Sequence, residues 1–68
     1  MDDVRQRLAG NLRKLRTAKG LSQEAFADLA GIHRTYVSDL ERGARNPTIT
    51  VVEKLAHGLG VTAGELLA

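Results

Sequence analysis

Residues 21–43 of the chain read LSQEAFADLAGIHRTYVSDLERG, and their spacing indicates two helices joined by a short turn. Ser22 precedes a run of helical spacing and offers a side-chain oxygen to the free amides of a first helical turn. Gly31 follows that run, where a chain leaving a helix often needs a positive φ that glycine adopts without steric cost. Helical spacing then resumes and stops at Gly43. Two short helices are expected over about 23–29 and 33–42, joined by a turn at 30–32.

The side chains of this stretch divide into an inward set and an outward set. Small Ala27 lies where the second helix would cross the first closely. The inward positions are Phe26, Leu29, Ala30, Ile32, Val37 and Leu40. The outward positions of the second helix are His33, Arg34, Thr35, Ser38, Asp39 and Arg42. This register predicts a helix-turn-helix, and the alternative is a helical bundle with a tight corner.

Three further helices are expected around this motif, and no strand pattern appears. The first, over about 2–18, stacks Val4, Leu8, Leu12 and Leu15 on one side and ends at Gly20. Thr48 or Thr50 caps the fourth, since Thr50 and Glu53 have capping-box spacing. Its apolar repeat is Val52, Leu55, Ala56 and Leu59. A capping box of Thr62 and Glu65 opens the last helix, which carries Leu66 and Leu67. The fold class is therefore all-α, with five helices.

The length predicts a single domain spanning 1–68, because folded domains begin at about 50 residues. The charge makes this domain slightly basic. Lys and Arg number 10 and Asp and Glu 8, for a net charge of +2. The charge is uneven, since residues 1–20 hold six bases and two acids whereas residues 21–43 hold two bases and four acids. A DNA-binding domain and a merely basic first helix would both show this asymmetry.

Several classes of function lack the residues they need. The chain has no cysteine, and its two histidines, His33 and His57, are far apart, so neither a disulfide nor a metal site is expected. No nucleophile arrangement or complete dinucleotide fingerprint is present, so the chain is not expected to be an enzyme or to hold a cofactor or small-molecule ligand. The absence of a long apolar run or signal peptide predicts a cytoplasmic protein without a membrane partner.

The motif set resembles the Cro/C1-type helix-turn-helix family, also called the Xre family, over about residues 5–67. It consists of residues 21–27, 30–32, 37–43, 46–48 and 55–56. The resemblance implies a compact, lambda-repressor-like DNA-binding domain that acts in transcription regulation as a repressor or activator. Within the family, residues 34–38, 41–42 and 45–46 look most like the controller proteins of restriction–modification operons.

The resemblance and the chemistry of the side chains together assign DNA contacts. Arg34 lies near the N-terminus of the second motif helix, where a guanidinium fork matches guanine O6 and N7. Base contacts are expected from Arg34, Thr35, Tyr36 and Ser38, and backbone contacts from Gln23, His33, Arg42, Arg45 and Asn46. Tyr36 could instead pack against the first motif helix, and the arginines could be solvated surface charges. Asp39 argues against uniform attraction to DNA, although a carboxylate can accept from cytosine N4, so its role is open.

Two further expectations concern an internal ion pair and the assembly of the protein on DNA. The resemblance implies an ion pair between Arg16 and Glu41 that joins the first and third helices. One recognition helix supplies about three base contacts of ~1–3 kcal/mol each, whereas specific sites need ~4–10 kcal/mol, so a homodimer on a palindromic operator is expected. The interface is expected at Val61, Leu66 and Leu67, with Ile49 or Val52, unless these residues only close the core.

A second class of function uses the same fold. An antitoxin or other protein-interaction module would carry the helix-turn-helix while gripping a protein partner. Co-purification with that partner would favour this alternative. A steep loss of DNA affinity with salt, together with selection of one palindromic site, would favour the sequence-specific regulator.

Overall fold

The computed structural model describes residues 3–68 and contains five α-helices in that part of the chain, with no strand. They are α1 (Val4–Ala18), α2 (Gln23–Ala30), α3 (Arg34–Glu41), α4 (Ile49–Leu59) and α5 (Ala63–Leu67). The expected all-α fold and the helix-turn-helix are confirmed. The expected start of the first helix at residue 2 lies outside the described residues.

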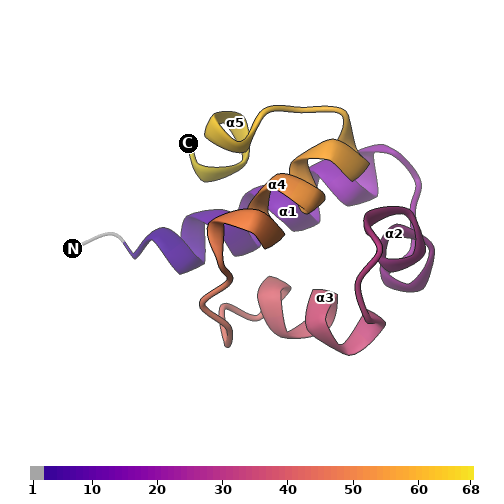
Figure 1. The fold of residues 1–68 in the computed structure, drawn as a ribbon, viewed down its shortest axis with the longest axis horizontal. Coiled ribbons are helices and arrows are strands. Elements are labelled where there is room, and N and C mark those ends of the chain that lie inside the picture. The colour runs from indigo at the N-terminus through magenta and orange to yellow at the C-terminus, as the bar shows by residue number, and fades with distance from the viewer. Residues whose placement is uncertain (1–2) are drawn as a thin grey trace.

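The helices are arranged so that α3 lies at one edge of the molecule. Helices α1 and α4 cross its middle, α5 lies on one side of them and α3 on the other, with α2 at the end opposite the start of α1 (Figure 1). Helix α1 packs against both α3 and α5, and α2 packs against α3 and α4. Helix α3 is thus supported from behind and faces outward along its free side.

The core draws on all five helices. Its fully buried side chains are Leu12, Phe26, Val37, Leu40, Leu55, Leu59 and Leu66. Each such burial contributes about 1.5–3 kcal/mol from apolar surface removed from water. Phe26 of α2 packs close to Gly58 of α4, where an added Cβ would lie 3.1 Å from the ring. The motif therefore shares one core with the helices around it.

Each helix begins after a side chain that accepts a hydrogen bond from its first turn. The Ser22 Oγ accepts from the Ala25 amide at 3.0 Å, and the Thr62 Oγ1 accepts from the Glu65 amide at 3.1 Å, as expected. For α4 the cap is Thr48, which accepts from the Val51 amide at 3.2 Å. The alternative cap, Thr50, is wrong, because the extended backbone ends at Thr48 and Thr50 already lies within the helix.

Leu29 was expected to face inward, and this is wrong, because its side chain is 61% exposed. The inward face of the eight-residue α2 is filled by Phe26, Ala27 and Ala30, which leaves Leu29 on the shoulder of the helix. Val4 is likewise 46% exposed at the first turn of α1, before the helix reaches its neighbours. Both side chains therefore contribute apolar area to the protein surface, although the helical spacing predicted that they face the core.

The turn of the motif depends on the backbone conformation of Gly31. It ends α2 with φ of +72°, and no atom lies within 4 Å of a Cβ built on it. Gly31→Ala should therefore cost about 1–2 kcal/mol in free energy of unfolding from backbone strain alone. Gly10→Ala is the matched control, because Gly10 lies inside α1 with equally open surroundings and alanine there should stabilise by up to ~1 kcal/mol. Urea denaturation measures the free energy of unfolding of both variants. Equal effects of the same sign would contradict the requirement for a positive φ at Gly31.

Candidate nucleic-acid interface

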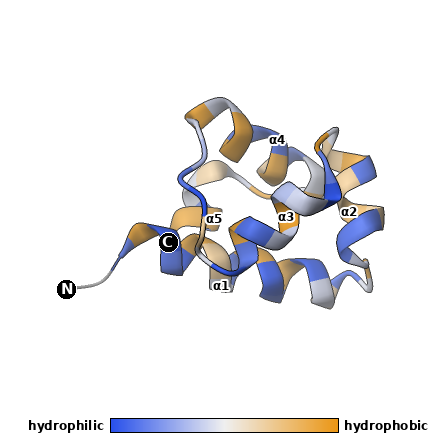
Figure 2. Cartoon of the chain, turned by 90° about the horizontal axis from the view of Figure 1, so that it is seen from below, coloured by the Kyte–Doolittle hydropathy of each residue, from blue (hydrophilic) through white to orange (hydrophobic). Residues whose placement is uncertain are grey.

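Helix α3 turns two buried residues toward the core and a polar face away from it. Val37 and Leu40 are 0% and 1% exposed. At about 100° per residue, Thr35, Ser38 and Asp39 fall on the opposite side of the helix. Figure 2 views the molecule from the side where α3 lies. The outward set predicted for this helix therefore occupies the accessible edge of the fold.

Arg34 lies at the exposed first position of α3. Together with Gln23, Thr35 and Ser38 it lines a shallow hollow of about 200 Å³ between the N-termini of α2 and α3. Within residues 3–68, no acceptor engages the Arg34 guanidinium. All five of its N–H donors are thus available to a ligand that enters from outside. The four residues were predicted as DNA contacts, and the fold brings them together.

The Arg16–Glu41 ion pair implied by the resemblance is present. The Arg16 Nε and NH2 groups donate to the two Glu41 oxygens at 2.6 and 3.0 Å, with side chains 11% and 5% exposed. Its hydrogen bond to Glu41 raises the pKa of Arg16. Arg16 also donates to the Leu21 carbonyl at 2.7 Å, and Gln23 donates to Glu41 at 3.1 Å. This network joins α1, the start of α2 and the end of α3.

Gln23, predicted to bind phosphate, is therefore also a structural residue. One hydrogen of its amide group reaches Glu41, which holds the side chain at the mouth of the hollow. The second amide hydrogen remains for an anion outside. The N-terminus of α2 adds its own amides, which favour negative charge at that end of the helix.

His33 caps α3 instead of lying in its first turn. Its Nδ1 accepts from the Thr35 amide at 3.0 Å, so the neutral ring carries its hydrogen on Nε2. The ring is exposed, and Nε2 can donate to a phosphate oxygen beside Arg34. The phosphate role predicted for His33 is compatible with this geometry.

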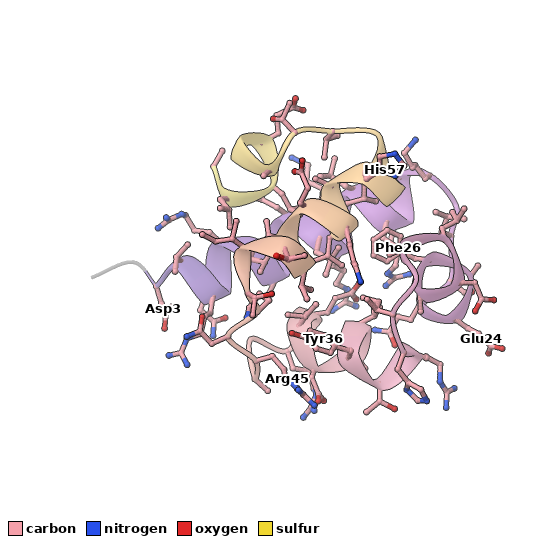
Figure 3. All side chains as sticks on the ribbon, viewed as in Figure 1. Asp3, Glu24, Phe26, Tyr36, Arg45 and His57 are labelled. Carbon is pink, nitrogen blue, oxygen red and sulfur yellow. The ribbon has the colours of Figure 1, made fainter. Side chains whose placement is uncertain are left out.

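A second polar group lies at the other end of the outward face. The Tyr36 ring packs against the core and carries the Arg45 guanidinium over it, 4.7 Å from the ring centroid (Figure 3). Asp39 bonds Arg42 through one oxygen, and Arg45 through the other at 3.3 Å. The hydrogen bond from Arg42 is the main cause that lowers the pKa of Asp39. Asn46 is exposed in the following loop.

Tyr36 packs against the core and also contacts Arg45, and its base contact stays a prediction. Its ring is half-buried against the core, and the same ring supports an arginine at the exposed edge. The Arg42 and Arg45 side chains are 66% and 50% exposed, although both bond Asp39. They are therefore neither wholly solvated nor free.

The expected interface residues separate into buried and exposed ones. Leu66 was expected to be partly exposed, and this is wrong: it is 0% exposed and closes the monomer core. Val52 is also buried, and Val61 and Leu67 are half-buried. Ile49 is 88% exposed. Leu66 is buried because α1 holds α5 down, with the Asn11 amide donating to the Leu66 and Ala68 carbonyls at 2.9 Å each.

Asn11 was not singled out from the sequence. Its position on a helix flank gave no signal, because its partners are carbonyls more than fifty residues away.

Within residues 3–68, no three His, Asp or Glu side chains gather where they could hold a metal ion. No helix of that part of the chain is long and apolar enough to cross a membrane.

The paired helices, the open Arg34 hollow and the outward α3 face define a helix-turn-helix DNA-binding protein. Residues 12–66 match the helix-turn-helix family, and the chain belongs to this family. It is 44% identical over 69 residues to control protein C.MunI of a Mycoplasma species, covering 100% of the chain and 93% of that relative. The resemblance to Cro/C1-type proteins, controller proteins among them, is confirmed.

Solved structures agree with the sequence relationship. The restriction-modification controller protein C.AhdI from Aeromonas hydrophila shares 47% identity with a TM-score of 0.88, over 91% of this chain and 94% of that one. The controller protein C.Esp1396I, solved as a tetramer with its natural 35 base-pair operator, shares 30% identity with a TM-score of 0.84 over 100% of both chains. The chain is a transcriptional regulator of this family.

Proposed function

We propose that the protein regulates a restriction–modification operon in the cytoplasm by binding a palindromic operator as a homodimer, through binding alone and without catalysis. The observation that carries the proposal is the hollow lined by Gln23, Arg34, Thr35 and Ser38 on the outward edge of α3. The hollow offers a guanidinium fork for guanine and neighbouring hydroxyls for bases or phosphates. The controller relatives and the operator complex of C.Esp1396I support it.

The two polar groups of α3 support a division of labour. Arg34 is uncommitted and lies at the helix N-terminus, where side chains reach base edges in this class of motif. Arg42, Arg45 and Asn46 lie at the other end and in the loop, where they can reach the backbone. We assign base reading to the residues of the hollow and to Tyr36, and backbone clamping to the second group together with Gln23 and His33.

We place the dimer interface at the end of the molecule where α1 begins and α5 ends (Figure 1). A largely apolar hollow of about 170 Å³ opens there, lined by Val4, Arg5, Leu8, Asn46, Pro47, Ile49, Val52 and Leu67. Ile49 is the most exposed large apolar side chain of the described residues, at 88%. A two-fold axis at this end would place Ile49 of one copy against the hollow of the other.

The experiment that tests the function is selection of binding sites from a random duplex library by the purified protein. A palindromic consensus is expected, with half-sites about 34 Å apart, because two recognition helices read one face of the duplex. Affinity for the selected duplex should fall steeply with salt. Failure to enrich any sequence, with no duplex bound in dilute buffer, would reject the regulator and leave the protein-interaction module as the alternative.

Ile49→Ser tests the proposed interface. Loss of one buried isoleucine costs about 1.5–3 kcal/mol, so the dissociation constant of the dimer should rise at least about tenfold. Sedimentation velocity over a concentration series measures it. Leu29→Ser is the matched control, because Leu29 is also exposed, at 61%, but lies on α2 outside this hollow. Weakening by the Leu29 variant alone would move the interface to the α2 side.

A further inference from the structure

Asp39 is the one acidic residue on the outward face of α3, and each of its oxygens accepts one hydrogen bond from an arginine. Arg42 donates to Oδ1, and the Arg45 Nε donates to Oδ2 at 3.3 Å. The carboxylate is 18% exposed, whereas the two arginines are 66% and 50% exposed. The acid therefore lies beneath two bases that the proposed function places on the DNA backbone.

Tyr36 fixes the arrangement from the side. Its ring lies under the Arg45 guanidinium, so Arg45 is held by a carboxylate at Nε and by an aromatic face at its carbon (Figure 3). Such stacking is worth about 0.5–1 kcal/mol at an exposed site. Both arginines point outward already paired, and the three charged groups sum to one positive charge.

This pairing has a direct consequence for phosphate binding. Each arginine bonds Asp39 through one nitrogen and keeps its other N–H donors for a phosphate, but a phosphate bound there lies close to the Asp39 carboxylate and is repelled by its charge. DNA of random sequence is bound almost wholly through phosphates, so it meets this cost without compensation. A major-groove cytosine can offset the cost, because its N4 amino group donates to a carboxylate. Only DNA with a cytosine opposite Asp39 supplies this compensating hydrogen bond.

We propose that Asp39 is a specificity-determining residue: its charge repels the DNA phosphates that Arg42 and Arg45 bind, and a cytosine amino group of the operator compensates for that repulsion. The inference rests on the proposed function. Asp39 thereby widens the gap between operator and random DNA by weakening the random complex. Asp39 lies at the opposite end of the α3 face from Arg34. Arg34 increases the same difference in affinity by strengthening the operator complex.

The test compares wild-type protein with Asp39→Asn on two duplexes, the one selected by the wild type and a scrambled duplex of equal length and composition. One additional phosphate contact changes the salt slope by about 0.9, which is about eightfold in affinity at 0.1 M salt. We expect D39N to bind the scrambled duplex about eightfold more tightly for each copy of the protein on the DNA, with a steeper salt slope. Its affinity for the selected duplex should stay level or fall, and its reselected consensus should lose a cytosine preference.

Glu53→Gln is the matched control, since it removes the same charge from an exposed site on α4 outside the cluster. It should change both affinities by the same small factor. Asp39→Ala serves as a second variant if D39N destabilises the fold, because alanine is the strongest helix former. The inference is overturned if both Asp39 variants bind scrambled DNA no more tightly than E53Q does. A wild type that binds no duplex would instead overturn the proposed function.

Discussion

Glu41→Ala is expected to lower the free energy of unfolding by about 3–5 kcal/mol. Glu41 is 5% exposed at the side chain and accepts hydrogen bonds from Arg16 and Gln23. Removing it leaves the nearly buried Arg16 guanidinium with the Leu21 carbonyl as its remaining partner. The cost arises from that stranded charge more than from the lost attraction, because burying the pair already required removing both charges from water.

Thermal and urea unfolding followed by circular dichroism measure this effect. For a domain of this size, 1 kcal/mol shifts the melting temperature by about 4–8 °C, so the variant should melt more than about 10 °C lower. The control is the double variant Arg16→Met with Glu41→Leu, which removes both charges and should recover most of the loss. Wild-type melting of the single variant would show that the network contributes no stability.

The same network has a functional consequence. Helix α3 is held on its inner side by Val37 and Leu40, and its C-terminal end is held by Glu41. Because Gln23 bonds the same carboxylate, the mouth of the Arg34 hollow is fixed relative to α1. Stability and the geometry of the hollow therefore depend on one buried carboxylate.

Features set by neighbouring residues could be predicted from the sequence. Ser22, Gly31 and Thr62 act within one helical turn of their positions in the chain, so caps and turns follow from residue type and spacing. The buried stripe of α3 follows from periodicity. The candidate site residues share one helix and its flanks, so their spacing predicts a common face, and the structure brings them together in two groups on that face.

Features set by distant packing could not be predicted in this way. Leu29 and Leu66 have the same residue type, yet one is 61% exposed and the other 0%, because α1 covers α5 and nothing covers the shoulder of α2. Spacing cannot state which side of a short helix meets a neighbour. The pairing of Asp39 with Arg45 depends on how the loop after Gly43 returns, and the open role of Asp39 reflects this.

Arg34→Ala is expected to abolish most of the preference for the selected duplex. A bidentate contact to guanine is worth ~1–3 kcal/mol of discrimination, which is about 5-fold to 150-fold for each half-site. Arg34 has no acceptor within residues 3–68, so its removal strands no internal partner and the fold should melt as the wild type does. Fluorescence anisotropy on selected and scrambled duplexes measures the ratio of affinities. The affinity for the scrambled duplex should change little by comparison.

Arg45→Ala is the matched control at the other end of α3. It removes a guanidinium that faces the backbone in the proposed complex, so both duplexes should be bound more weakly by similar factors, with a salt slope lower by about one for each copy. The two variants carry the same change in charge, made at the start of α3 in one and in the loop after α3 in the other. Arg34 is uncommitted at the helix N-terminus, whereas Arg45 is stacked on Tyr36. Equal losses from both variants on both duplexes would mean that Arg34 binds phosphate and that base reading lies elsewhere on the face.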